Sequence, residues 1–131
     1  MQTPVALGLT LCDALIIEEG TRKVSLIGCF SALTAQQFPT APRTFFAYAD
    51  LTDSEGALTA ELVVSRLDTQ EEIYRTQRTV HFADRLRVVR CGVKVADCRF
   101  PAPGEYLITL FVGGDWVAQR PVSVYAAGDL G

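Results

Sequence analysis

Residues 100–125 read FPAPGEYLITLFVGGDWVAQRPVSVY, and this stretch decides the fold. Two prolines, which cannot donate ladder hydrogen bonds, and Gly104, which permits a tight bend, predict a corner before Tyr106. Two strand-like runs follow, Tyr106–Val112 and Trp116–Tyr125, and the Gly-Gly-Asp sequence between them predicts a β-hairpin. A Pro-Gly-x-Tyr corner that enters the last hairpin is typical of immunoglobulin-like sandwiches.

The rest of the chain repeats this pattern of short strands and turns. Alternation of apolar and polar residues predicts strands at 5–11, 24–30, 44–51, 58–65, 73–82 and 86–95, with residues 14–19 also extended. Pro39 and Pro42 predict a loop that crosses between sheets. No segment shows a helical period with capping residues. We therefore expect an all-β fold, an antiparallel Greek-key β-sandwich of about eight strands, immunoglobulin-like or C2-like, with a closed barrel as the alternative.

Size and composition limit the classes of protein to which the chain can belong. A length of 131 residues predicts one domain over residues 1–131. The contents of 49% hydrophobic and 21% charged residues are those of an ordinary globule, and the net charge of -3 gives no general attraction to nucleic acid or to membrane surfaces. Residues 5–17 lack the features of an export signal, so we expect a cytoplasmic protein.

The four cysteines carry no recognisable metal or cofactor motif. Cys12, Cys29, Cys91 and Cys98 form no C-x-x-C pair, and His81 is the one histidine that could join them. A zinc site is therefore disfavoured, and we expect no cofactor. Thiols stay reduced in the cytosol, so most of these side chains are expected to be small buried hydrophobes.

Both ends of the chain resemble a known bacterial family. Cys12-Asp13, Glu18-Glu19-Gly20 and the run KVSLIGCF at residues 23–30 are similar to the opening of a family of small all-β proteins of unknown function. The segment from Phe100 to Tyr106 is similar to the closing hairpin of that family, although Thr21-Arg22 separates Gly20 from Lys23 in this chain. The resemblance implies the fold and brings no activity or ligand with it.

Acidic residues at two places in the chain are candidates for a catalytic or metal-binding role. Asp13, next to Cys12, is interpreted as a structural side chain where a strand changes direction, with a catalytic or metal role as the alternative. Cys12 itself would need a basic neighbour to be a reactive thiol. A calcium site in one loop would use Asp50, Asp53 and Glu55, with Asp68 or Asp115 from a second loop; a solvated turn is the simpler interpretation.

The most distinctive feature is a basic segment. Residues 75–99 contain seven of the twelve basic residues and two of the fifteen acidic ones, so this segment carries +5 and the remainder −8. If the strands at 73–82 and 86–95 are neighbours, Arg75, Arg90 and Lys94 share one outward face. We predict that this face meets an acidic protein surface or a second copy. The alternative is a solvated edge protected by charge.

These observations favour a non-catalytic protein-binding or assembly module, and we do not expect an enzyme. A protein partner or self-association fits the charge asymmetry, whereas nucleic acid and membrane partners do not. Two alternatives stay open: a sandwich that binds carbohydrate, lipid or calcium, and an enzyme of unrecognised type.

Overall fold

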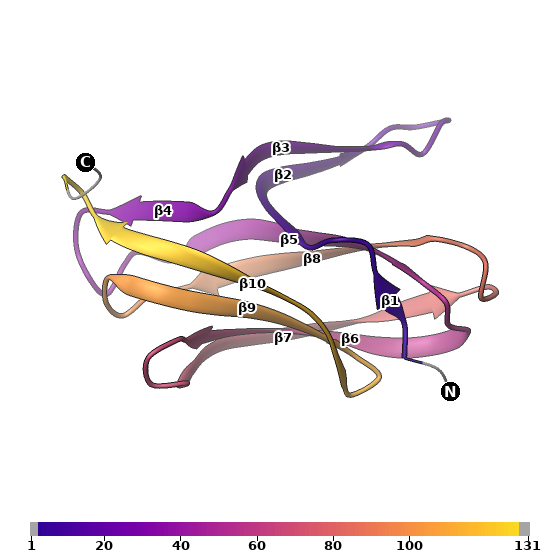
Figure 1. Ribbon diagram of the computed structural model, residues 1–131. Helices are drawn as coiled ribbons and strands as arrows, with labels where there is room; N and C mark the ends of the chain where they lie inside the picture. Colours follow the sequence, from indigo (N-terminus) through magenta and orange to yellow (C-terminus); the bar gives the residue numbers. More distant parts are fainter. Residues whose placement is uncertain (1–2, 129–131) are drawn as a thin grey trace.

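The computed structural model describes residues 3–128 as two β-sheets packed face to face (Figure 1). The strands are β1 (Val5–Ala6), β2 (Thr10–Ile17), β3 (Val24–Phe30), β4 (Ala32–Ala35), β5 (Arg43–Thr52), β6 (Gly56–Arg66), β7 (Glu72–Phe82), β8 (Val89–Cys98), β9 (Gly104–Val112) and β10 (Asp115–Ala126). The predicted all-β sandwich is confirmed, with ten strands because β1 and β4 are short additions. These residues contain no helix, and hence none that could span a membrane.

The order of the strands explains how the chain closes its core. In the first sheet β5 is central, with β8 along one side and β1 and β2 along the other, and β3 lies beyond β2. The second sheet has the order β4-β10-β9-β6-β7. After β7 the chain crosses to β8 in the first sheet and returns to β9 beside β6, a connection of Greek-key type. One pair departs from the antiparallel expectation, since β4 runs parallel to β10.

The core is formed by alternate residues of the two inner faces. Phe45 and Leu51 of β5 and Val95 of β8 point inward from the first sheet, and Leu62 of β6 and Ile108 of β9 meet them from the second. All five are essentially inaccessible to solvent. The strict alternation of burial along β5 shows why this sequence folds as a strand with one buried face.

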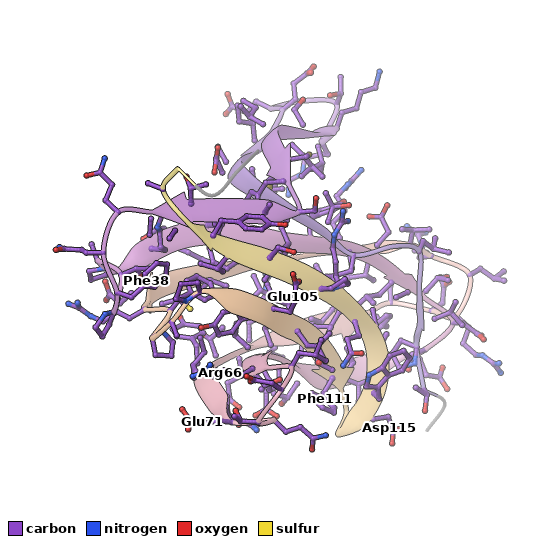
Figure 2. All side chains as sticks on the ribbon, turned by 60° about the vertical axis from the view of Figure 1, so that its left-hand side comes forward. Phe38, Arg66, Glu71, Glu105, Phe111 and Asp115 are labelled. Atoms are coloured by element: carbon purple, nitrogen blue, oxygen red, sulfur yellow. The ribbon has the colours of Figure 1, made fainter. Side chains whose placement is uncertain are left out.

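The corner predicted before the last hairpin is confirmed. The Tyr106 hydroxyl donates a hydrogen bond to the Ala102 carbonyl oxygen at 2.6 Å, and its ring packs edge-on against Phe100 with centroids 4.9 Å apart. The hairpin of β9 and β10 follows, and Gly113 and Gly114 adopt positive φ angles in its turn. Glu105, labelled in Figure 2, fixes the outer face of this hairpin by accepting hydrogen bonds from Ser123 Oγ at 2.7 and 2.8 Å.

The predicted strand at 5–11 is wrong in its first half. Gly8 has a φ of 94°, which breaks the extended chain between β1 and β2. Leu9 and Leu11 point into the core as expected, but Val5 and Leu7 are exposed. A single glycine therefore separates a two-residue strand from the strand that carries the core.

The predicted adjacency of the two basic strands is also wrong. β7 pairs with β6 and β8 pairs with β5, so the two are edge strands of opposite sheets. Side chains still join them across the open side of the sandwich: Arg78 Nη1 donates to the Gly92 carbonyl oxygen, and the Ala96 amide donates to Tyr74 Oη at 3.0 Å. Arg78 is thus an inward-facing residue of an edge strand, with no bulge at its position.

Candidate binding site

The strands β2 and β3 form a ribbon that leaves the first sheet. β2 pairs with β5 only from Thr10 to Cys12, whereas it pairs with β3 as far as Ile17. Beyond Cys12 the two strands therefore continue as a two-stranded ribbon, which lies above β5 and β8 in Figure 1 and rises from the top of the sandwich in Figure 2. Such a ribbon presents two faces and two free edges to its surroundings, the edge of β3 and the shorter edge of β2 beyond Cys12.

Asp13 and Gly28 mark the point where the ribbon departs. Gly28 has a φ of 69°, and a Cβ atom at this position would overlap the Asp13 carboxylate. The structure thus gives Asp13 a packing role at a change of strand direction. Burial raises the pKa of the neighbouring Cys12 thiol, which opposes the ionisation that a reactive thiol needs.

One face of the ribbon is turned toward the first sheet and the other toward solvent. Leu15 lies opposite Leu26, and Ile17 lies opposite Val24; all four line hollows between the ribbon and the sheet. The outward face carries Ala14, Ile16, Ser25 and Ile27, and here Ile16 is 48% and Ile27 49% exposed. The ribbon is thus apolar on both faces, and one of them is uncovered.

Two adjoining hollows lie beneath the ribbon and share Tyr48 and Arg90 in their floor. The first, about 460 Å³ in volume, is completed by Lys23, Val24, Leu26, Asp50 and Val88. The second, about 290 Å³, is completed by Leu15, Ile17, Arg22, Arg78 and Gly92. Gly92 allows the ribbon to approach this closely, because a Cβ there would overlap the Leu15 side chain. We call the two hollows together the groove.

The floor of the groove contains one carboxylate, and it is already engaged. Tyr48 Oη donates to Asp50 Oδ1 at 2.6 Å, and Asp50 lies directly opposite Arg90 on the neighbouring strand. Burial, followed by this hydrogen bond to Asp50, raises the pKa of Tyr48, so the phenol stays a hydrogen-bond donor.

The cations of the groove have no carboxylate partner among residues 3–128. Within the described part of the chain, no ion pair joins Arg22, Lys23 or Arg90 to an acidic side chain, and Arg78 is bound to a carbonyl oxygen. Other basic side chains do have such partners: Arg85 Nη2 lies 3.1 Å from Asp53 Oδ1, and Arg87 Nε lies 3.2 Å from Asp84 Oδ2. The groove thus gathers four basic side chains, Arg22, Lys23, Arg78 and Arg90, that form no ion pair with a carboxylate of the described residues.

The structure separates the three residues of the predicted interaction face. Arg90 and Lys94 lie on the outer face of the first sheet, but Arg75 lies on the outer face of the second, where it pairs with Glu61 and Glu72. The prediction that the three residues share one face was wrong, because it required β7 and β8 to be neighbours in one sheet. Of the three residues, only Arg90 lines the groove.

The acidic residues considered for calcium are dispersed. Asp53 pairs with Arg85, Asp68 lies 3.5 Å from Arg66, and Asp115 accepts a hydrogen bond from Thr3 at 2.8 Å. Over residues 3–128, no group of three or more His, Cys, Asp or Glu side chains is placed to hold a metal ion. His81 is an exposed residue on the outer face of β7.

Sequence reasoning predicted the hairpin around Gly20 but missed Tyr48, Arg22 and the departure of this hairpin from the first sheet, which brings them together. Tyr48 belongs to an aromatic-rich strand, and Arg22 belongs to a hairpin turn, so neither stands out by spacing. Gly28, inside an otherwise apolar strand, is the signal that marks the bend, because glycine in a strand interior often indicates a bulge or a close approach.

Three solved structures are similar to this chain, and the first of them, with a TM-score above 0.5, supports the fold. The C-terminal domain of wzt is 11% identical over 95% of this chain and 74% of that one, with a TM-score of 0.55. A β-glucosidase from Listeria innocua is 9% identical over 90% of this chain and 16% of that one, with a TM-score of 0.47. An immunoglobulin-like protein from Pseudomonas aeruginosa is 10% identical over 94% and 97% of the two chains, with a TM-score of 0.43.

Comparison by sequence identifies the family. No curated protein matches the chain in sequence. The sequence profile of one family, described as a family of unknown function (DUF6941), matches residues 7–125, which include the ribbon, the groove and the tyrosine corner. The chain therefore belongs to this family of unknown function.

Proposed function

We propose that the chain is a non-catalytic assembly module of the cytoplasm that pairs with a second copy of itself along the free edge of β3. The observation that carries this proposal is the composition of that edge. The seven residues of β3 read VSLIGCF and include no charge and no proline. Beyond its pairing with β2, no other described strand pairs with β3.

The edges of β4, β7 and β8 are protected in the usual ways, and the free edge of β2 is short, because it begins only beyond Cys12. Natural sheets blunt their edges with charged side chains, with proline or by keeping the edge strand short. β7 carries Glu72, Arg75 and Arg78, β8 carries Arg90 and Lys94, and β4 has only four residues. An edge without such protection is a template for an added strand, which is a common mode of protein recognition.

Two-fold symmetry suits β3 as its own partner. In an antiparallel pair centred on Ile27, this residue meets its symmetry copy on the axis, and Ser25 faces Cys29 of the second copy. Lys23 faces Ser31 of the second copy, so no like charges are opposed. The pairing is isologous and closed, which favours a dimer over a fibre.

The pair would also extend the uncovered face of the ribbon. Ile16 and Ile27 of both copies would lie on the same side of a four-stranded sheet and cover part of one another. Backbone hydrogen bonds and apolar contact would carry the association. It should therefore persist in about 1 M salt, where the Debye length falls to ~3 Å and charge steering is lost.

Light scattering across a dilution series tests this proposal. The wild-type chain is expected to be dimeric at the higher concentrations, and Ile27→Lys to be monomeric, because its charge would meet the same charge across the axis. Leu67→Lys is the matched control, since Leu67 is 48% exposed but lies in the turn after β6. A wild-type monomer at every concentration, or an Ile27→Lys variant that dimerises as the wild type does, would refute the proposal.

A further inference from the structure

We infer that the groove binds a small amphipathic anion, with its oxyanion head between Arg22, Arg78 and Arg90 and its apolar tail along Val24, Leu26 and Val88. The two hollows differ in the side chains that line them, and this difference sets the orientation of the ligand. The smaller one is lined by three guanidinium groups and no carboxylate. The larger one has three aliphatic side chains in its wall, and besides Lys23 and Arg90 it holds the carboxylate of the groove, Asp50, which would repel an anionic head.

The head position follows from arginines that form no ion pair with a carboxylate of the described residues. Arginine is suited to carboxylate and phosphate groups because its planar fork can donate two parallel hydrogen bonds. Arg78 donates one N–H to the Gly92 carbonyl oxygen, which holds its side chain at the rim of the smaller hollow. Arg22 is held by the ribbon turn, where its amide donates to the Glu18 carbonyl oxygen at 2.9 Å. The Arg78 guanidinium and the Arg22 backbone are therefore held in place before any ligand arrives.

The tail position follows from the inward face of the ribbon. Val24 and Leu26 of β3 point toward the first sheet, and Val88 stands beside them although it is 54% exposed. Burying these side chains against an alkyl tail is favourable, at about 25 cal/mol for each Å² of apolar surface removed from water. The Tyr48 hydroxyl lies between the two hollows and already donates its hydrogen bond to Asp50. It therefore does not donate to the head group of the ligand.

The size and electrostatics of the groove fit a ligand of this class. A hollow of about 460 Å³ falls within the range of roughly 300–1,000 Å³ that is usual for small-molecule sites. Four basic side chains and one carboxylate line the groove as a whole. Low-dielectric walls of leucine, isoleucine and valine strengthen the field of those cations, so an anion is favoured over a neutral or cationic molecule of the same shape.

Titration of the ¹⁵N-labelled protein with decanoate tests the inference by NMR. The expected result is saturable shifts of the Leu15, Tyr48 and Gly92 amides. Decyltrimethylammonium, which has the same tail and the opposite charge, should bind at least roughly tenfold more weakly, because it offers no acceptor to the arginines. Equal binding of the two probes, or shifts confined to Ile16 and Ile27 on the outward face, would overturn the proposal.

Substitutions place the head group. Arg90→Gln should weaken decanoate binding roughly tenfold, and Arg75→Gln, on the outer face of the other sheet, should leave it unchanged. Arg22→Asn is a second test in an exposed turn, where asparagine tolerates the φ of 62° and the fold is not at risk. Decanoate affinity that is the same in all three variants would contradict the assignment.

Two further measurements separate this site from other sources of binding. Sedimentation with phosphatidylglycerol vesicles distinguishes a free amphiphile from a lipid headgroup: we expect decanoate to bind in solution and the vesicles not to retain the protein. Vesicle binding without decanoate binding would overturn the inference. Ile27→Lys should bind decanoate as the wild type does, so a failure of the dimer proposal and a failure of the ligand proposal are distinguishable.

Discussion

Gly28 approaches Asp13 so closely that a side chain at position 28 would overlap the Asp13 carboxylate. The two residues lie across from each other where β2 and β3 leave the first sheet. A left-handed φ of 69° turns the chain of β3 at this point. The bend raises the ribbon over β5 and β8, and the groove and the exposed edge both depend on it.

Gly28→Ala should therefore destabilise the fold. An alanine at positive φ costs on the order of 1 kcal/mol, and overlap with Asp13 adds to that, so we expect a loss of about 1–3 kcal/mol in the free energy of unfolding. Urea denaturation measures it. In the Asp13→Ala background the same substitution should cost less, because the overlap is relieved. Equal losses in both backgrounds would show that the close contact is irrelevant.

The tyrosine corner gives a second prediction. Tyr106→Phe removes the hydroxyl that donates to Ala102 at 2.6 Å, which should lower the free energy of unfolding by about 1 kcal/mol. Tyr125→Phe is the control, since within the described residues the Tyr125 hydroxyl makes no hydrogen bond. Chemical denaturation of both variants should separate them, and losses of the same size would count against the corner as a source of stability.

One of the four cysteine thiols should react rapidly in the native protein, and the other three should be protected. Cys29 is exposed, whereas Cys12, Cys91 and Cys98 are buried and burial raises the pKa of each. With a pKa of about 12, roughly one Cys98 thiol in ten thousand is ionised at pH 8. A disulfide-exchange reagent should titrate one thiol rapidly in the native protein and four after denaturation. Rapid reaction of two or more native thiols would contradict this burial.

The same burial predicts a dependence of stability on alkaline pH. Burial raises the pKa of Cys98 from 9.0 to about 12, so above pH 9 the unfolded chain loses a proton that the folded chain keeps. The stability contributed by the protonated thiol is complete below pH 9 and declines between about pH 9 and about pH 12, by at most about 1.4 kcal/mol per pH unit.

Denaturation of the wild type and Cys98→Ala at several alkaline pH values tests that decline. The wild type should be the more stable at neutral pH, and its advantage should shrink as the pH rises. Cys29→Ala is the control, because removing an exposed thiol should leave the slope unchanged. Parallel curves for the wild type and Cys98→Ala would refute the effect.

Local chemistry made the closing hairpin predictable from the sequence. The corner is determined by Pro101, Pro103 and Gly104, and the turn by Gly113 and Gly114. The ends of β9 and β10 can therefore be predicted from local sequence alone. The alternation of apolar and polar residues from Leu58 to Leu62 likewise predicted β6, since one face of a half-buried strand must be apolar.

Long-range pairing made the groove unpredictable. The assignment of Arg75, Arg90 and Lys94 to one face failed because strands that follow each other in sequence can belong to different sheets, and β7 and β8 do. Arg22 and Arg78 meet at the groove only because the ribbon bends at Gly28, and a bend of that kind leaves no periodic signature in the sequence.

The most direct test of assembly through β3 is a crosslink on the proposed two-fold axis, with Ile27→Cys in a Cys29→Ser background. Residues opposed in an antiparallel pair have Cα atoms about 4.5–5.5 Å apart, within the range of roughly 4.4–6.8 Å that a disulfide spans. Mild oxidation should convert this variant to a covalent dimer on a non-reducing gel, while Leu67→Cys in the same background stays monomeric. A persistent Ile27→Cys monomer, or equal crosslinking of the Leu67→Cys control, would contradict assembly through β3.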